Sequence, residues 1–156
     1  MSSVASFGAK SGTVLDTLPM PSCAVFLGYE FLSIDRERSR MRVRFMGSKE
    51  MLNPRGGVQG GMLVAMMDDA MGSMVVALTD GAKGPASVDI HTQFLRPAGV
   101  EPLICEAELV YLTKNSAFTR ATLMNEAGDI VATATQTAKL FDISGKHTEQ
   151  SKGDGT

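Results

Sequence analysis

The sequence predicts an α+β domain in which a strongly curved antiparallel sheet encloses one long helix. Residues 58–78 form a proline-free run rich in Met, Ala, Val and Leu, which favours a helix about 30 Å long. Segments of strand type lie on both sides of this run, two before it and four after it. Because the helix is apolar on nearly every face, we expect it to be buried, and a sheet that wraps around it provides that cover.

The two strands before the helix are predicted from apolar density and from alternation. Residues 25–35 carry enough apolar side chains for a first strand, with Gly28 as a bend or bulge. Met41, Val43 and Phe45 then alternate with arginines, which predicts a second strand with one face in the core. The two strands are expected to form a hairpin.

The segment after the helix is predicted to be entirely sheet, once residues 81–85 (GAKGP) have broken the chain. In the first of these strands Ser87 shares a face with Asp89 and His91. In the last strand three β-branched threonines share a face. The predicted strands are residues 87–95, 103–112, 118–124 and 130–141, and the threonines are Thr133, Thr135 and Thr137.

The length of 156 residues fits one domain. We expect a partly disordered N-terminal extension over residues 1–20, the folded domain over residues 21–142 and a polar tail over residues 143–156. The chain has 15 basic and 17 acidic residues, so its charge gives no reason to expect binding to nucleic acid or an anionic membrane.

Cysteine usage and the N-terminal segment bear on the compartment. Cys23 and Cys105 are far apart, with no histidine at ligand spacing, so neither a disulfide framework nor a metal site is indicated. The N-terminus lacks the apolar core of a signal peptide, and the central helix carries two aspartates where a membrane span needs apolar residues. The sequence therefore favours a cytoplasmic protein.

The loop before the helix is the most specific chemical feature of the sequence. Glycines allow close approach to the backbone, and the first N–H groups of a helix lack intrahelical acceptors, so the amides of Gly60 and Gly61 form a donor site. Such a site can stabilise an oxyanion, by about 3 kcal/mol for each well-placed donor. Alternatively, these glycines only permit a tight entry into the helix. Asn53 and Gln59 offer side-chain amides nearby, although Asn-Pro is also an ordinary turn signal.

Two carboxylates interrupt the apolar helix. Asp68 has three possible roles, as a nucleophile, as a general base for water, or as a structural hydrogen-bond acceptor. Asp69 lies about 100° further round the helix, where we expect it to face solvent or to form a salt bridge. His91 and His147 have no partner at the spacing of a metal site or a catalytic triad, and we interpret both as structural.

At these residues the sequence resembles the hotdog-fold acyl-CoA thioesterases, specifically the phenylacetic-acid-pathway type. That family has an Asn, a short glycine-containing loop, His-Gly-Gly, and an acidic residue nine positions after the His. Here the pattern is present as Asn53, Gly57, Gln59-Gly60-Gly61 and Asp68, with the step of nine residues kept. The resemblance extends from about residue 25 to residue 141 and includes the strand SVDIHTQFLRPA, which begins at Ser87.

The resemblance implies a hotdog fold and hydrolysis of an acyl-CoA thioester. By analogy, the Gly60 amide polarises the thioester carbonyl with help from Asn53, and Ser87 helps to position water. Asp68 of the neighbouring subunit acts as general base or nucleophile. The family is dimeric, often a dimer of dimers, with its sites at the dimer interface. Coenzyme A enters as part of the substrate, and no separate cofactor is expected. An open sheet also has edges that must be paired or protected, which fits the same assembly.

The coenzyme A end of the substrate is assigned by the same resemblance. Gly61 and Met62 are expected to bind the substrate. The acyl group stays open among phenylacetyl, benzoyl and medium-chain types, because a pocket rich in Met and Phe suits all of them. The pantetheine arm is expected near a segment that follows the second strand after the helix. The cations among the candidate contacts named next are explained equally well as solvated surface residues. The candidate contacts are Lys114, Asn115, Ser116 and Arg120, with Arg96 as another phosphate contact.

One departure from the family pattern affects the interpretation. Gln59 stands where the family has His, and an amide donates a hydrogen bond but cannot carry a proton charge. If that His only positions groups, activity survives, and if it must ionise, this protein is slow or only binds acyl-CoA. A non-catalytic acyl-CoA-binding protein is therefore the alternative. The dehydratase branch of the fold needs a catalytic His that neither His91 nor His147 is placed to supply.

Overall fold

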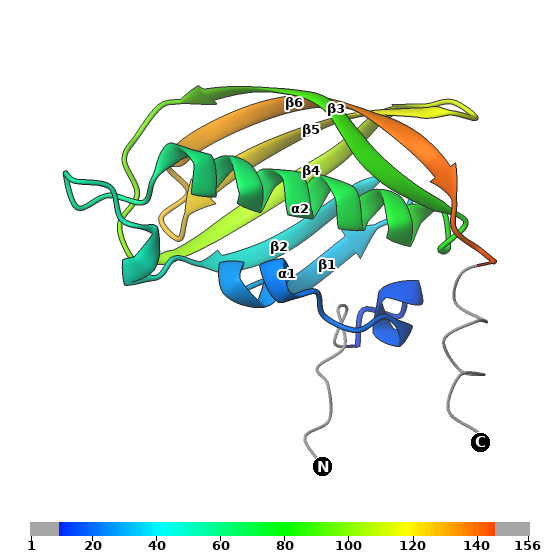
Figure 1. Ribbon diagram of the computed structural model, residues 1–156, viewed down its shortest axis with the longest axis horizontal. Coiled ribbons are helices and arrows are strands. Elements are labelled where there is room, and N and C mark those ends of the chain that lie inside the picture. The colour runs from blue at the N-terminus through cyan, green and yellow to red at the C-terminus, as the bar shows by residue number, and fades with distance from the viewer. Residues whose placement is uncertain (1–9, 146–156) are drawn as a thin grey trace, which may run out of the picture.

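The computed structural model describes residues 10–145, which form one six-stranded antiparallel sheet curved around a long helix (Figure 1). The strand order is β1-β2-β4-β5-β6-β3, so β1 and β3 are the edge strands. The elements are η1 (Val14–Thr17), α1 (Ser22–Leu27), β1 (Glu30–Asp35), β2 (Arg40–Met46), η2 (Lys49–Met51), α2 (Gly60–Leu78), β3 (Lys83–Phe94), β4 (Pro102–Leu112), β5 (Ser116–Asn125) and β6 (Ile130–Asp142).

The architecture confirms the predicted α+β class and the order of two strands, one long helix and four strands. Helix α2 packs against β2, β3, β4, β5 and β6. Its methionines meet inward-facing apolar side chains of the sheet, and together they form the main core. Completely buried members of this core are Met66, Met71 and Met74 from α2, and Phe45, Leu103 and Leu123 from the sheet.

Helix α2 is largely buried as expected, but one stripe of it is not covered by the sheet. The stripe follows helical spacing and consists of small residues, one valine and an aspartate, all of them partly or fully exposed. Helix α2 has the length and hydropathy of a membrane span, but half of that window is buried inside the protein, as in a core helix. The residues of the open stripe are Gly61, Ala65, Asp68, Gly72 and Val76.

The first predicted strand is half wrong, because residues 22–27 form helix α1 and the strand begins only at Glu30. Apolar density alone does not separate a short helix from a strand. The better signal was Pro21 before the segment and Gly28 after it, since proline favours the start of a helix and glycine its end. Gly28 has φ 68°, and a Cβ there would lie 2.9 Å from Cβ of Met46.

The N-terminal segment is tied to the same core where the structure describes it. Leu15 in η1 is completely buried, and Val14 lies against Gly81 at the end of α2. The disorder predicted for the start of the chain concerns mainly residues 1–9, and most of the polar tail is residues 146–156. Both segments lie outside the described residues.

Strand β3 departs from the sequence prediction at both its start and its middle. It begins at Lys83, so Gly84 and Pro85 pair within the sheet instead of breaking the chain, and proline is tolerated because β3 is an edge strand. The ladder to β6 shifts between Ser87 and Asp89, which leaves Val88 as a bulged residue that is 65% exposed.

Candidate active site

The loop before α2 is held in shape by the side chain of Asn53. Its Oδ1 accepts hydrogen bonds from the backbone N–H of Arg55 at 2.9 Å and of Gly57 at 3.3 Å. Gly56 between them has φ 84°, a conformation that favours glycine. With Oδ1 engaged in the turn, the amide nitrogen of Asn53 remains for a ligand: no described residue accepts a hydrogen bond from it.

The loop ends at the start of α2, where two backbone N–H groups have no acceptor among the described residues. The N–H of Gln59 is bonded to the carbonyl of Met51 at 2.8 Å, and the Gln59 carbonyl accepts from Met62 at 2.8 Å. Within residues 10–145, the N–H groups of Gly60 and Gly61 have no acceptor, and the Gln59 side chain does not cap the helix. The positive end of the helix dipole therefore carries free amides, as the sequence predicted.

A hollow lies beside Gly60 at the start of α2, and we call it the donor hollow. The ring of Phe94 closes one side, since a Cβ on Gly60 would lie 3.1 Å from the ring. Glycine at this position thus lets an aromatic ring lie against the start of the helix. The donor hollow is lined by Asn53, Gly57, Val58, Gly60, Leu63, Phe94, Leu95, Arg96 and Pro97.

Asp68 lies in a second hollow, further along α2, which we call the carboxylate hollow. The hydroxyl of Ser87 donates to Oδ1 of Asp68 at 2.7 Å, and Nε2 of Gln136 donates a short hydrogen bond to the same oxygen. Among the described residues nothing donates to Oδ2. The carboxylate hollow is lined by Pro21, Asp68, Asp69, Gly72, Ser73, Val76, Pro85, Ser87 and Gln136.

The bulge in β3 brings Ser87 to Asp68. Ser87 pairs with the buried Ala138, so it faces the helix, whereas Asp89 pairs with Thr137 on the outer face of the sheet. The prediction that Ser87 shares a face with Asp89 and His91 is therefore wrong. Strict alternation assumes a regular ladder, and one extra residue reverses the faces beyond it.

Gln136 is a member of the site that we did not predict. It is 4% exposed and, besides Asp68, its Nε2 bonds the Ser87 hydroxyl at 3.0 Å. A signal was present in the last strand: if its three threonines share the outer face, Gln136 between them must face the core. A glutamine placed among buried alanines is rare enough to indicate a functional or structural partner.

Asp69 is only partly exposed and forms no salt bridge with the described residues, so it is neither the solvent-facing nor the salt-bridged side chain that we expected. Its Oδ2 is buried and has no hydrogen-bond partner among residues 10–145. Burial, and to a lesser degree the charge of Asp68, raises the pKa of Asp69 to about 6. Within residues 10–145, the Asp68 carboxylate accepts hydrogen bonds from side chains of two strands, whereas no side chain donates to Oδ2 of Asp69.

The two hollows of one protomer are separate. They share no lining residue, and the eight residues from Gly60 to Asp68 correspond to about 12 Å along the helix axis. An acyl carbonyl bound to the Gly60 amide is therefore far from the carboxylate of the same chain, because attack requires about 3 Å.

Comparison with known proteins bears on what these hollows do. The thioesterase superfamily family model matches residues 56–132. A phenylacetic acid degradation-related protein from Ralstonia eutropha JMP134 is 32% identical, with a TM-score of 0.76, and the match covers 81% of this chain and 95% of that one. The chain belongs to the thioesterase superfamily. No curated protein matches this chain significantly.

Two further solved structures show the same hotdog fold as this thioesterase-superfamily protein. The PaaI protein of the E. coli phenylacetic acid degradation operon is 20% identical, with TM-score 0.70 and coverage of 78% of this chain and 85% of that one. A hypothetical thioesterase from Streptococcus pneumoniae TIGR4, crystallised with coenzyme A, is 20% identical, with TM-score 0.68 and coverage of 78% and 91%. The predicted hotdog fold and the resemblance to the phenylacetic-acid type are confirmed.

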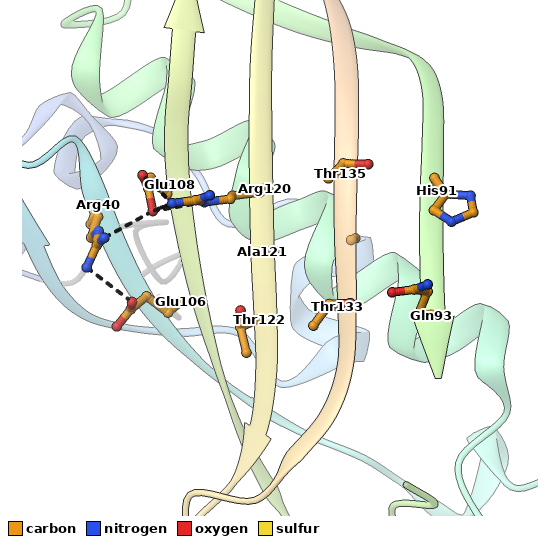
Figure 2. Close-up of a pocket in the computed structure, with 11 residues that line it drawn as sticks. Arg40, His91, Gln93, Glu106, Glu108, Arg120, Ala121, Thr122, Thr133 and Thr135 are labelled. Carbon is orange, nitrogen blue, oxygen red and sulfur yellow. Dashed lines mark hydrogen bonds and ion pairs between the residues drawn. The ribbon is translucent and has the colours of Figure 1, made fainter. Parts of the chain in front are cut away.

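The candidate cations of this thioesterase-superfamily protein lie in different places. Arg96 lines the donor hollow, with Asp129 at 3.9 Å. Arg120 lies on the outer face of the sheet, where two of its nitrogens bond Glu108 at 2.9–3.1 Å. Figure 2 shows that Arg40 reaches the same carboxylate from the other side. Only Arg96 is near the predicted donor site.

The remaining candidates of this superfamily member are positioned as follows. Lys114 and Asn115 lie in the turn between β4 and β5. Ser116 begins β5 and pairs with Lys139 of β6, near the end of that strand at Asp142. Met62 packs against the main core. Within residues 10–145, no three His, Cys, Asp or Glu side chains are close enough to hold a metal ion. His91 is exposed on the outer face, and His147 lies outside the described residues.

Proposed function

We propose that this protein is an acyl-CoA thioesterase that hydrolyses an acyl- or aryl-acyl-CoA to the free acid and coenzyme A. The observation that carries the proposal is the Asp68 carboxylate, which two donors from β3 and β6 hold by one oxygen at the surface of a hollow. A purely structural carboxylate would be expected to have donors on both oxygens or an ion pair. Asp68 instead keeps Oδ2 available for chemistry.

The chemistry divides between the two hollows. The thioester carbonyl lies in the donor hollow, where the Gly60 N–H and the Asn53 amide stabilise the negative charge that develops on its oxygen. Asp68 either removes a proton from the attacking water or attacks the carbonyl carbon itself. With water as the nucleophile, the C–S bond then breaks, coenzyme A leaves as a thiolate that takes up a proton, and the acyl group becomes the free acid. With Asp68 as the nucleophile, the same C–S cleavage leaves an acyl anhydride on Asp68, which water then hydrolyses to the free acid and the restored carboxylate. In this scheme Ser87 keeps Asp68 oriented and positions the water.

A second subunit is needed to complete this site, and we propose a homodimer or a dimer of dimers. The separation of about 12 Å between Gly60 and Asp68 in one chain supports this assembly. So does the open stripe of small residues on α2, which leaves room for a neighbouring backbone. Strand β3, at the free edge of the sheet, offers unpaired backbone groups beside that stripe. In the dimer, Asp68 of one chain faces Gly60 of the other.

The coenzyme A moiety is proposed to pass Arg96, since this cation lines the hollow that holds the reacting carbonyl. Gly61, which is exposed, and Met62 are proposed to contact the acyl group. The segment with Lys114, Asn115 and Ser116 is proposed as the second phosphate contact. Arg120 is the weakest candidate, because Glu108 already neutralises it in a bidentate pair. The coenzyme A bound to the Streptococcus pneumoniae protein supports this ligand class.

We further propose that the reaction takes place in the cytoplasm, away from membranes and nucleic acid, with no cofactor besides the coenzyme A of the substrate. The near balance of 15 basic and 17 acidic residues supports this assignment.

One observation favours a second candidate, a non-catalytic acyl-CoA-binding protein. Gln59 replaces the His of the family pattern, and its exposed amide cannot transfer a proton. The two candidates differ in turnover, whereas both bind acyl-CoA.

The experiment is a thiol-release assay with phenylacetyl-, benzoyl- and octanoyl-CoA. It uses a Cys23→Ser background, because Cys23 is exposed and would itself react with the thiol reagent. Asp68→Asn should lower kcat by at least about 100-fold with unchanged folding, whereas the matched variant Asp69→Asn should stay within about 5-fold of wild type. Equal turnover of wild type and Asp68→Asn, or no turnover by either, would remove the hydrolase assignment.

A further inference from the structure

The side-chain amide of Gln136 is buried beside the carboxylate hollow, and both its nitrogen and its oxygen have hydrogen-bond partners. Strand β6 presents it to α2 between Ala134 and Ala138, and only 4% of it is exposed. Its Nε2 donates to Oδ1 of Asp68 and to the Ser87 hydroxyl, and its Oε1 accepts from the hydroxyl of Thr119 at 3.3 Å. A buried amide is costly without such partners, so its hydrogen bonds define how it is oriented.

Thr119 determines which end of the amide faces Asp68. It lies on β5, is 3% exposed, and its hydroxyl can donate either to Oε1 of Gln136 or to Sδ of Met71 at 3.2 Å. The thioether is the weaker acceptor. With the oxygen of the amide turned to Thr119, its NH₂ group must point toward Asp68. The reverse orientation would place a carbonyl oxygen against a carboxylate.

We propose that Gln136 is a positioning residue that fixes the Asp68 carboxylate for the hydrolysis, with Thr119 fixing Gln136 in turn. The inference rests on the proposed function. Ser87 and Gln136 both bond Oδ1, and two donors from different strands prevent the carboxylate from rotating about its Cβ–Cγ bond. Oδ2, which has no donor among the described residues, is thereby held in one position for the reaction. Small misplacements of a reacting group cost up to about 100-fold in rate, so this restraint acts on kcat.

The first test compares Gln136→Met, which keeps the volume but loses both hydrogen-bonding ends, with Gln93→Met, which alters an exposed glutamine on the outer face of β3. With phenylacetyl-CoA, Gln136→Met should lower kcat at least about 10-fold and leave KM within about 3-fold. Gln93→Met should match wild type. An unchanged kcat in Gln136→Met, or an equal loss in Gln93→Met, would overturn the inference.

The second test uses pH and separates orientation from core filling. Within the described residues, Asp68 and Asp69 are the ionisable side chains that line this hollow. In Gln136→Glu, the new carboxyl group can donate to Asp68 only while it is protonated. Its kcat relative to wild type should therefore fall at least about 10-fold between pH 5 and pH 8. The ratio for Gln136→Met should stay constant with pH, and parallel profiles for the two variants would contradict the inference.

Thr119→Val is the third variant and applies even if changes at Gln136 impair folding. It removes the donor to Oε1 and should lower kcat by about 3- to 10-fold, whereas Thr122→Val on the outer face of the same strand should not. In Thr119→Val/Gln136→Met the losses should not add, because both act through one amide. A wild-type protein without any turnover would contradict both the proposed function and this inference. Active wild type with full activity in Thr119→Val would sink the inference alone.

Discussion

The hydroxyl of Ser87 lies 2.7 Å from Oδ1 of Asp68, although 19 residues separate the two along the chain. One belongs to the exposed edge strand β3 and the other to the open stripe of α2. Because the hydroxyl also accepts from Gln136 at 3.0 Å, its own proton is directed to the carboxylate. Ser87 is therefore a donor to Asp68 and not a free nucleophile.

Ser87→Ala is expected to lower kcat about 10-fold with little change in KM. The substitution removes one of two donors to Oδ1, so the carboxylate gains freedom while Gln136 still holds it. Steady-state kinetics with phenylacetyl-CoA measure the effect. Ser33→Ala is the control, because Ser33 is exposed on the opposite edge strand β1. Equal kcat for wild type and Ser87→Ala would show that one donor suffices.

Gly60→Pro tests the backbone donor directly. Proline is well tolerated at the first position of a helix, and Gln59 before it has the extended conformation that proline requires, with φ −58° and ψ 135°. The N–H disappears, so kcat should fall about 100-fold. Gly60→Ala keeps the N–H and controls for the new contact between Cβ and the ring of Phe94. Activity lost equally in both variants would point to this contact instead of the donor.

The composite site predicts complementation between two inactive variants. Asp68→Asn and Gly60→Pro, co-expressed with different tags, should regain about a quarter of wild-type activity. Half of randomly formed dimers are then mixed, and each mixed dimer has one site with both groups intact. The purified mixed dimer should retain about half of wild-type kcat. If mixing restores nothing, donor and carboxylate act within one chain.

The partly buried Asp69, whose Oδ2 has no partner among the described residues, predicts that stability decreases as pH rises from about 4 to 6. In this window the native protein keeps a proton on Asp69 that the unfolded chain has already released, because folding raises its pKa from 3.8 to about 6. Each pH unit corresponds to about 1.4 kcal/mol, so the ionised side chain costs at most about 3 kcal/mol at pH 7.5. Asp69→Asn removes that cost.

Urea unfolding at pH 4 and pH 7.5 measures this effect. Asp69→Asn should be more stable than wild type at pH 7.5, and the difference should shrink toward zero at pH 4. Asp89→Asn, which changes an exposed aspartate on β3, shows what the loss of a single surface charge does. A difference for Asp69→Asn that is independent of pH would disagree with a buried, unpaired carboxylate.

The sequence was sufficient for the parts of the fold that depend on local pattern. The proline-free run up to Leu78 predicted α2, and the alternation of Met41, Val43 and Phe45 predicted β2 with the correct face buried. Residues 25–27 were included in the predicted first strand although they belong to α1, because so short an apolar segment carries too little periodicity to separate helix from strand.

Candidate site residues could be named from the sequence where they stand in a contiguous motif. Asn53, Gly60 and Asp68 belong to one loop and one helix, and the glycines, the carboxylate in an apolar helix and the resemblance to the thioesterase pattern pointed to them together. Gln136 belongs to the last strand, far from Asp68 in the sequence. Their contact depends on the order of the strands in the sheet, which the sequence pattern does not give. The face of Ser87 depends on the bulge, which a single strand does not reveal because a bulge is a property of pairing.

The bulge at Val88 limits how strand β3 can be redesigned without moving Ser87. If β3 were made regular with Val88 kept in the ladder, Val88 would pair with Ala138 and Ser87 would move opposite the exposed Lys139. The same change would turn the hydroxyl of Ser87 from the helix side of the sheet to solvent, and Asp68 would lose its support. A more regular protein would thus be a poorer catalyst, and stabilising substitutions chosen from backbone ideality should leave this irregularity alone.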